Sequence, residues 1–530
     1  MIGAKLSGLT QLSKAILSRK HPDYDDFVDQ WAMYEDTYRG GRKWFKKHIH
    51  KYHKEGDEEF ATRVDRAYRF NHPKEIVDLV NKYIYRATIS RSESVPEEIK
   101  AFWKSSSKRG WPIEEMMPVL NKWSSVFGRI WVVVDATKLN VDKDATKLTS
   151  RDVKGMGYRV WSYWVRPQDV LDLEYDESDG QLSWVLIKES YRVNGEDPLK
   201  PNGGMRTRYR LWTRTKSTLY QHKINEKGEE LQNIEEVDSN IHNLGVVPVI
   251  PLDNITSNED YTSSSLIADI AYLDKAVANY LSNLDAIIQD QTFSQLAMPA
   301  QALMFGESED SKKTRESYVE MGKKRVFLYD GESKQPPFYL SPDPKQAELI
   351  ITAIRQIINE IYHSVGVAGE RTKQDNSQGI DNSSGVAKAY DFERVNSLLS
   401  SKGATLQRFE NTLCEMILRY HGVYKGRNEE DWVKYPDNYD VRGFADELNI
   451  SERLELISTP LKLRQHQLKR AVEKLYPSMA EDKREELFKA IDDMEDTLDL
   501  LGKAGVDDSV ASNALPNEQN QDSGNDGKDD

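Results

Sequence analysis

Three long stretches of this chain place apolar residues at alternating steps of three and four, the spacing of one face of a helix. They cover residues 262–291, 343–366 and 385–420. Asp343 and the following Pro344 open the second stretch with residue types that favour a helix start. We therefore predict three long helices, the third interrupted in its seam by Lys402. The seam residues are Leu266, Ile270, Leu273, Val277, Tyr280, Leu284 and Ile287, then Ala347, Ile350, Ile354, Ile357, Ile361 and Val365, then Phe392, Val395, Leu399, Leu406, Phe409, Leu413, Met416 and Tyr420.

Before these helices the chain changes from helical to strand patterns. Residues up to about 127 are predicted to be mostly helical, with "HPKEIVDLVNKYIYRAT" as one amphipathic helix and two more that break at Gly110 and Pro112. Residues from about 128 to 252 alternate apolar and polar positions between turns, which predicts a β-rich module. Its clearest strands are "RIWVVVDA", "YRVWSYWV", "DVLDLEY", "QLSWVLIKESY" and "RYRLWTR". The predicted fold class is therefore α+β.

Shorter and more polar segments complete the chain. Residues 292–342 combine the polar "GESEDSKKTRES" with the strand-like "VFLYD", and are predicted to form a small module between the first two long helices. Residues 451–501 carry helical patterns rich in both charges. Residues 502–530 have almost no apolar content, so we expect them to be a disordered acidic tail.

Composition excludes several classes of protein. The 530 residues carry a net charge of −14, which should repel nucleic acid on average, so any contact with DNA must be local or weak. The mean hydropathy is −0.70, and no run approaches the roughly 18 apolar residues of a membrane span, so we expect a soluble chain. The single cysteine, Cys414, excludes disulfides within the chain and cysteine-rich metal sites.

The segment "DNSSGVAKAY", Asp381 to Tyr390, has the small residues of a phosphate-binding loop. A P-loop requires a Lys and a Ser or Thr directly after its last Gly. Here Val386 follows Gly385, so the motif fails. No serine–histidine–aspartate arrangement and no pair of acid and base stands out, and we expect a chain without catalytic activity.

Three histidines in "HIHKYH" form the strongest metal candidate. On a helix His50 and His53 share a face without His48, and on a strand His48 and His50 share a face without His53. No regular element presents all three, so we expect no metal. A metal-dependent nucleic-acid enzyme that uses this cluster with nearby carboxylates is kept as an alternative.

The surrounding "RGGRKWFKKHIHKYHK" combines basic and aromatic residues, which is also typical of nucleic-acid surfaces. Trp44, Phe45, Ile49 and Tyr52 recur at helical spacing, which leaves the Lys and Arg residues on the opposite face. We favour an amphipathic helix packed on the protein.

Four aspartates lie along the first long helix, which carries only one lysine, Lys275. They are Asp269, Asp274, Asp285 and Asp290. An exposed acidic face can serve solubility alone or can repel a polyanion, and the sequence leaves both interpretations open.

The order of these segments resembles the portal proteins of tailed bacteriophages. The resemblance rests on "YRGGRKWF" and "HPKEIVDLVNKYIYR", on a β module that ends in "LGVVPVIPLDN", and on "SSSLIADIAYLDKAVANYLSNLDAIIQDQ". It continues through "VFLYDGESKQPPFYLSPDPKQAELIITAIRQIINEIYHSVGV" and "NSSGVAKAYDFERVNSLLSSKGATLQRFENTL", and covers about residues 30–500. The succession of elements carries it, rather than any one motif.

The resemblance implies a dodecameric ring at one capsid vertex, made in the host bacterial cytoplasm and then part of the virion. Double-stranded DNA would be packaged and ejected through its channel, with no cofactor, metal or catalysis in the chain itself. The implied partners are further copies of the chain, the terminase, a head-completion or adaptor protein, and the major capsid and scaffolding proteins, with no membrane. The seams then imply helix packing within and between neighbouring subunits.

The resemblance also implies a division of the chain. It consists of an N-terminal segment, a wing, a first stem helix, a clip of small α/β type, a second stem helix, a tunnel loop, a long wing helix with its return, a helical crown and a tail. The corresponding residues are 1–19, 20–261, 262–291, 292–342, 343–366, 367–384, 385–450, 451–501 and 502–530.

Candidate site residues follow from that division. The four aspartates of the first stem helix become candidates for lining the channel, where carboxylates would keep contacts with phosphates weak. The tunnel loop would contact DNA through Thr372, Lys373, Gln374, Asp375, Asn376, Ser377 and Gln378. The clip would contact its partners through Lys312, Lys313, Arg315, Lys323, Lys324 and Arg325.

A helical adaptor or scaffold that is not a portal remains a third interpretation. In that case the long helices would form a bundle within one chain. It predicts a monomer or a small oligomer, whereas a portal predicts a ring.

Overall fold

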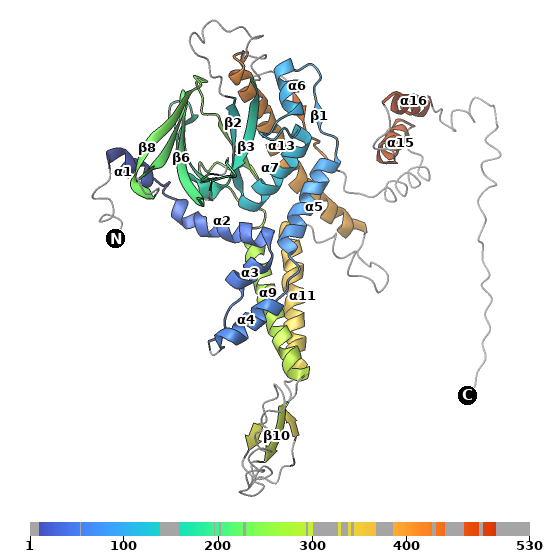
Figure 1. Ribbon diagram of the computed structural model, residues 1–530. Helices are drawn as coiled ribbons and strands as arrows, with labels where there is room; N and C mark the ends of the chain where they lie inside the picture. The colour runs from blue at the N-terminus through green and yellow to red at the C-terminus, as the bar shows by residue number, and fades with distance from the viewer. Residues whose placement is uncertain are drawn as a thin grey trace, which may run out of the picture. The chain divides into compact units, whose positions relative to one another are not determined.

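The computed structural model of the protein mixes helices with sheets, in agreement with the predicted α+β class (Figure 1). The chain divides into two compact units, Met1–Tyr439 and Asp440–Asp530. No helix of the described ranges combines the length and apolar character that a membrane crossing would need. The structure describes residues 10–53, 55–137, 158–194, 197–200, 203–225, 229–292, 295–299, 327–329, 336, 338–340, 344–366, 385–426, 431–439, 461–475 and 481–493.

Helices dominate the described residues before position 128. The amphipathic helix predicted from "HPKEIVDLVNKYIYRAT" is α5, and the two helices predicted around Gly110 and Pro112 are α6 and α7. Asn71 precedes α5 in the left-handed conformation and its side chain accepts a hydrogen bond from the Lys74 amide, which fixes the start of the helix. The buried face of α5 holds Ile76, Val77, Val80 and Ile84, as predicted. The helices are α1 (Gln11–Leu17), α2 (Tyr24–Arg39), α3 (Arg42–His48), α4 (Asp57–Arg66), α5 (His72–Arg86), α6 (Glu97–Lys104) and α7 (Ile113–Phe127).

A sheet of three antiparallel strands forms the centre of the larger unit. Its middle strand β2 (Arg129–Ala136) is almost completely buried and lies between β3 (Val160–Val165) and β9 (Val249–Asp253). Gly128 joins α7 to β2 with a φ of +89°, and a Cβ at this position would overlap the Ser263 carbonyl. Glycine is therefore required where the helix enters the sheet.

A second sheet has five antiparallel strands in chain order. The five strands predicted from the sequence are confirmed as β2 to β6, whereas β7 and β8 were not singled out. A short 3-10 helix, Pro167–Asp169, precedes the first strand of this sheet. The strands are β4 (Val170–Tyr175), β5 (Leu182–Arg192), β6 (Met205–Thr213), β7 (Lys216–Ile224) and β8 (Glu230–Ile241).

The first two long helices are α9 (Ala268–Thr292) and α11 (Pro344–Val365), which lie side by side (Figure 1). The α11 helix begins at Pro344, next to the predicted Asp343 cap. The predicted start of α9 at residue 262 is wrong by six residues. The preceding segment bonds to other parts of the chain instead, and Ser265 Oγ donates to the Val126 carbonyl over 2.7 Å.

Between α9 and α11 the described residues form a three-stranded sheet in the order β11-β10-β12. The strands are β10 (Gln295–Pro299), β11 (Phe327–Tyr329) and β12 (Phe338–Leu340). The strand predicted from "VFLYD" is therefore confirmed as β11.

The third long helix, α13, spans Gly385–Tyr420, as predicted. It packs against β9, α6 and α5. After it, β13 (Val433–Lys434) pairs with β1 (Ser90–Arg91). Under this pair Glu410 is buried and accepts hydrogen bonds from Arg91 and Tyr435.

The smaller unit contains α15 (Leu461–Leu475) and α16 (Glu481–Asp492), within the range predicted to be helical and rich in both charges. The two helices contact each other through an ion pair between Lys469 and Asp492 at 2.6 Å.

Candidate functional site

The α9–α11 helix pair is the candidate site, because the resemblance places the channel and the subunit contacts on it. Tyr362, near the end of α11, lies 3.1 Å from His72, whose backbone amide donates to Asp274 near the start of α9. The end of α11 therefore lies beside the start of α9, and the two helices run antiparallel. The two helices contact each other, and their buried side chains include Ile270, Val277, Leu281 and Leu284 of α9 and Ile354, Ile358 and Ile361 of α11.

Asp274 is buried rather than exposed, with 1% of its surface accessible. Its carboxylate accepts a hydrogen bond of 2.6 Å from Arg69, which also lies over the Trp44 ring at 4.0 Å and donates to the Thr37 carbonyl. Burial raises the pKa of Asp274, against the effect of Arg69. The prediction of an exposed acidic face is thus wrong for Asp274, because a partner distant in sequence covers it.

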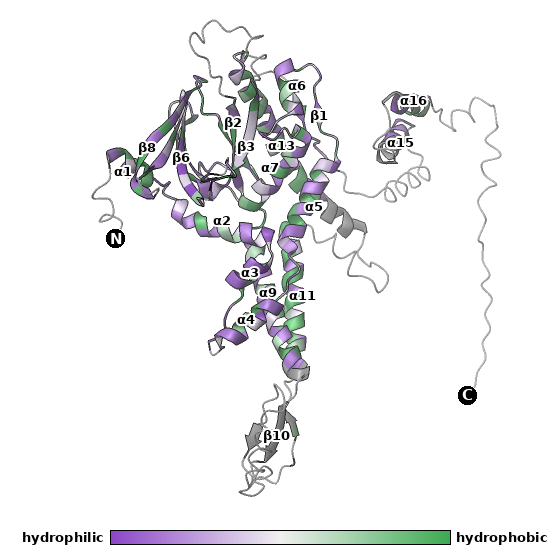
Figure 2. Ribbon diagram, in the orientation of Figure 1, coloured by the Kyte–Doolittle hydropathy of each residue, from purple (hydrophilic) through white to green (hydrophobic). Residues whose placement is uncertain are grey.

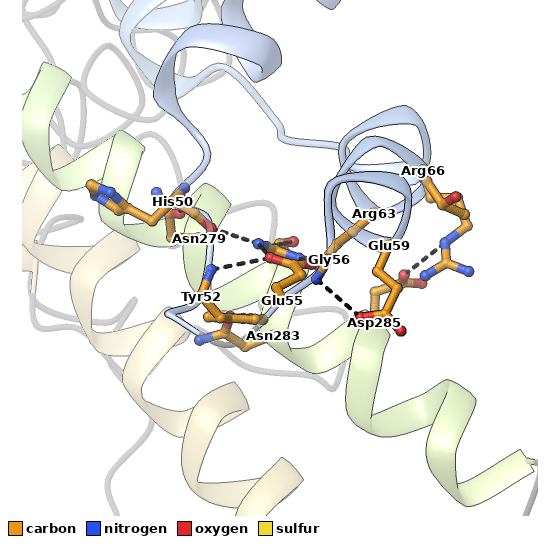
Figure 3. A network of polar contacts seen from close by, with 12 residues as sticks. His50, Tyr52, Glu55, Gly56, Glu59, Arg63, Arg66, Asn279, Asn283 and Asp285 are labelled. Atoms are coloured by element: carbon orange, nitrogen blue, oxygen red, sulfur yellow. Dashed lines mark hydrogen bonds and ion pairs between the residues drawn. The ribbon is translucent and has the colours of Figure 1, made fainter. Parts of the chain in front are cut away.

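The other three aspartates differ in their surroundings. Asp269 is exposed near the start of α9. Asp285 is half-buried and forms an ion pair with Arg66 at 3.4 Å (Figure 3). The side chain of Asp290 lies outside the described residues. Of the aspartates whose side chains the structure describes, Asp269, Asp274 and Asp285 do not form one exposed acidic stripe.

A polar network fixes α4 and the loop before it to α9 (Figure 3). Arg63 is buried at its centre and donates to Glu55 Oε1 and Oε2, both at 2.8 Å, and to Ser282 Oγ of α9 at 2.9 Å. Arg63 holds the pKa of Glu55 below its usual value, despite burial. The amide of His50 donates to the Asn279 side chain, also on α9, over 2.9 Å. The network covers one side of α9 with fixed, satisfied polar groups.

The basic and aromatic segment before this network packs on the protein, as the favoured interpretation predicted. Trp44, Phe45 and Ile49 are buried in a cluster with Val64 of α4 and Ala278 of α9. The helix is shorter than predicted, because α3 ends at His48 and Ile49 is extended. Tyr52 consequently lies outside the helix and is 43% exposed.

The three histidines do not converge. His48 is buried, and its Nε2 lies 3.3 Å from Asp36 Oδ2. Burial lowers the pKa of His48, which favours the neutral ring. His50 and His53 follow the end of α3 and are exposed. Within the described ranges, no three His, Cys, Asp or Glu residues are grouped so that they could hold a metal ion.

Two predicted sets of site residues lie outside the described residues. These are the tunnel-loop candidates from Thr372 to Gln378 and the clip candidates from Lys312 to Arg325. They remain predictions.

The arginines that hold α9 were not identified from the sequence. Arg63, Arg66 and Arg69 recur every three residues and contact Ser282, Asp285 and Asp274 respectively. An arginine at every third position of a short segment, together with a helix that carries spaced aspartates, is the signal that could have indicated this contact.

Comparisons with known proteins find similar solved structures but no matching protein family. No protein-family model matches the sequence, and no curated protein matches it. One similar solved structure is from the virion of a native gene transfer agent (GTA) particle, with 11% identity and a TM-score of 0.38 over 83% of this chain and 93% of that chain. A chain from the neck of an empty GTA particle, computed with C6 symmetry, has 12% identity and a TM-score of 0.37 over 74% and 88%. A chain from the neck of a native GTA particle, computed with C12 symmetry, has 9% identity and a TM-score of 0.39 over 85% and 94%. At TM-scores below 0.5 these likenesses carry no argument about function.

Proposed function

We propose that this chain is a portal subunit, which assembles into a ring at a capsid vertex and passes double-stranded DNA through its channel. One observation carries the proposal: the α9–α11 pair keeps large apolar side chains exposed in the single chain. In α9 these are Tyr272, Tyr280 and Ile288, which are 48%, 38% and 49% exposed. In α11 they are Leu349 and Ile351, which are 71% and 37% exposed.

Two of the three exposed apolar residues of α9, both tyrosines, lie on one side of the helix. Tyr272 and Tyr280 are eight residues apart, about 2.2 helical turns, so they lie about 80° apart around the helix axis. Elsewhere α9 contacts α11, α2, α5 and the Arg63 network. Hydrophobic residues occur along both helices in Figure 2. Burial of these side chains against the stem helices of the next copy would give each subunit the same contact, as a closed ring requires.

The DNA-handling parts of the proposal rest on the resemblance. Residues 367–384 would face the channel where it is narrowest, and residues 292–342 would contact the terminase and later the head-completion protein. The net charge of −14 supports a channel that passes DNA, because a surface rich in carboxylates does not retain phosphates. Of the four aspartates, Asp269 is the described candidate for the channel wall, because Asp274 is committed to Arg69.

Electron microscopy of the purified protein tests the proposal. We expect rings with a central hole and about twelve-fold symmetry. In a Tyr272→Lys/Tyr280→Lys variant, two lysines would have to be desolvated at the contact, so we expect folded monomers in place of rings. Ile241→Lys is the matched control, because Ile241 is 70% exposed on β8, and it should leave the rings intact. Monomers or dimers of the unchanged protein would refute the portal and favour the adaptor or scaffold. Rings that survive the double substitution would refute the contact through α9.

A further inference from the structure

Lys402 lies in the middle of α13 with its side chain fully enclosed. Only 1% of the residue is accessible. Its Nζ donates to Ser125 Oγ of α7 at 2.9 Å and to Asn254 Oδ1, just after β9, at 2.5 Å. At the next residue of α13, Tyr439 lies so close to Gly403 that a Cβ on Gly403 would overlap the Tyr439 hydroxyl. The residue that interrupts the apolar seam is therefore a buried amine held by two neutral partners.

The two partners of Lys402 can only accept hydrogen bonds from it. Ser125 Oγ uses its single proton in a 2.8 Å bond to the Asn121 carbonyl. The oxygen of the Asn254 side chain has no proton to give, and its Nδ2 donates to the Ser264 carbonyl at 3.0 Å. Two acceptors match the two N–H groups of a neutral amine, whereas an ammonium group has three. The geometry of the site thus favours neutral lysine.

Charged groups on the surrounding elements have other partners. Arg129 of β2 pairs with Asp253 at 2.5 Å and donates to the Asp260 carbonyl. Glu259 accepts from Thr262, and Glu410 of α13 pairs with Arg91. Other titratable groups on these elements include Glu114, Glu115 and Lys122 of α7 and Arg408, Glu415 and Arg419 of α13, and the Tyr439 hydroxyl also lies against α13. The hydrogen bonds of Lys402 in the described part of the chain go to Ser125 and Asn254.

The residues that bind Lys402 also hold residues 262–267, which we call the root of α9. The amide of Leu266 donates to the Ser125 carbonyl at 2.9 Å, and Ser265 Oγ bonds to the next carbonyl along α7. Asn254 binds the Ser264 carbonyl and also donates its amide to the Gly128 carbonyl at 2.6 Å. The Lys402 side chain of α13 therefore contacts both residues, Ser125 and Asn254, that bind the root of α9.

We infer that the protonation state of Lys402 controls the contact between α13 and the root of α9. The neutral amine stabilises this contact, and the ammonium group weakens it. Protonation adds a third N–H and a positive charge where the described residues supply no further acceptor and no carboxylate. The inference concerns the fold of one chain and does not depend on the portal proposal.

The pH range of the effect follows from linkage. Burial lowers the pKa of Lys402 to about 7 from its ordinary value of 10.5. In any state in which this contact opens to water, the amine regains the ordinary lysine pKa of 10.5 and binds a proton at pH values between about 7 and 10.5. Opening is therefore favoured most at pH 7 and below, and becomes about tenfold less favourable for each pH unit above 7.

Hydrogen–deuterium exchange of the full-length protein between about pH 6.5 and 8.5, corrected for the intrinsic pH dependence of exchange, tests the inference. Protection of peptides that cover residues 262–271 and 396–410 should rise about tenfold per unit above pH 7 in the unchanged protein. Lys402→Met and Lys402→Gln, which are always neutral, should remove this rise. Lys402→Arg, which is always charged, should show low protection throughout. Peptides from β6 and β7, far from Lys402 in the chain, are the internal control.

Each result decides the inference. A rise in protection in the unchanged protein that both neutral variants lose supports it. Protection that does not change between pH 7 and 8.5 in the unchanged protein overturns it without any variant, which covers the case in which a substitution prevents folding. A rise that persists in either neutral variant also overturns it, because another group must then titrate.

Discussion

Two buried sites hold α9 by opposite electrostatic means. Within the helix, Asp274 pairs with Arg69 at 2.6 Å, so that two opposite charges lie together away from water. Next to the segment that precedes α9, Lys402 of α13 binds Ser125 and Asn254, which are both neutral. Burial alone lowers the pKa of Lys402 to about 7. At the first site two opposite charges compensate each other, although burial raises the pKa of Asp274, and the second site is suited to a group that gives its charge up.

The two sites should therefore respond differently to the substitution of one residue and to a change of pH. A compensated pair does not tolerate the loss of one partner, because the other charge is then left buried. A neutralised lysine tolerates replacement by a neutral side chain but responds to pH. Both sites bear on the same helix, so changes of one residue at a time can compare them directly.

The largest expected effect is the loss of Arg69. Arg69→Met leaves the carboxylate of Asp274 buried without its partner, and we expect the free energy of unfolding to fall by about 3–5 kcal/mol. Urea unfolding at pH 7 measures the change. The double variant Arg69→Met/Asp274→Leu removes both charges and should recover a large part of the loss, though not the contacts of Arg69 with Trp44 and Thr37. A single variant that costs less than about 1 kcal/mol would contradict a compensated pair.

The next effect is the pH dependence that Lys402 contributes. Since the pKa of the folded state is lowered to about 7 from 10.5, the unfolded chain binds more protons between these values, and stability rises with pH. Relative to Lys402→Met, the free energy of unfolding of the unchanged protein should rise by about 1.4 kcal/mol per pH unit above pH 7. Below pH 7 the difference should be constant, with the Met variant the more stable. Urea unfolding of both proteins between pH 6 and about 9 gives the difference, which would be flat if the lysine kept its charge in the folded state.

A smaller effect is expected at the contact beside Asp274 that joins α11 to α5. The Tyr362 hydroxyl donates to Glu75 Oε2 at 2.6 Å and lies 3.1 Å from His72 Nδ1. Tyr362→Phe removes both contacts without changing the ring, and we expect a cost of about 1–2 kcal/mol in urea unfolding. Tyr280→Phe is a matched control, because Tyr280 is 38% exposed in α9, and it should cost less. Equal costs would show that the Tyr362 bonds do not help to join α11 to α5.

The sequence predicted those elements whose pattern is local. The limits of α11 and α13 follow from apolar spacing and from residues at their ends, and Ile76 to Ile84 of α5 are buried on the face that their spacing indicated. The start of α9 was wrong because Ser265 bonds to a carbonyl of α7 that is 139 residues away in the sequence. β7 was missed because it buries the polar Ser217 and Thr218 next to Leu219 and Tyr220, which breaks the alternation, and β8 was missed because most of its positions are exposed.

The candidate site was less predictable than the fold. Asp274 was expected to be exposed, but its partner Arg69 is 205 residues away in the sequence, and helix periodicity carries no information about such a partner. Lys402 stood out as an interruption of the seam, yet the two acceptors that explain it lie 277 and 148 residues away. The residues predicted to contact DNA, from Thr372 to Gln378, remain a prediction.

The smallest expected effect isolates burial as the cause of the difference between the sites. Asp285 lies on α9, as Asp274 does, and forms an ion pair with Arg66, but at 3.4 Å and with side chains 27% and 40% exposed. Water screens such a pair, so Arg66→Gln should cost less than about 1 kcal/mol in urea unfolding, and this cost should shrink further as salt is added. The cost of Arg69→Met should change little with salt, because its pair is enclosed. If Arg66→Gln instead costs as much as Arg69→Met, the charge of the arginines rather than their burial holds the α3–α4 region on α9.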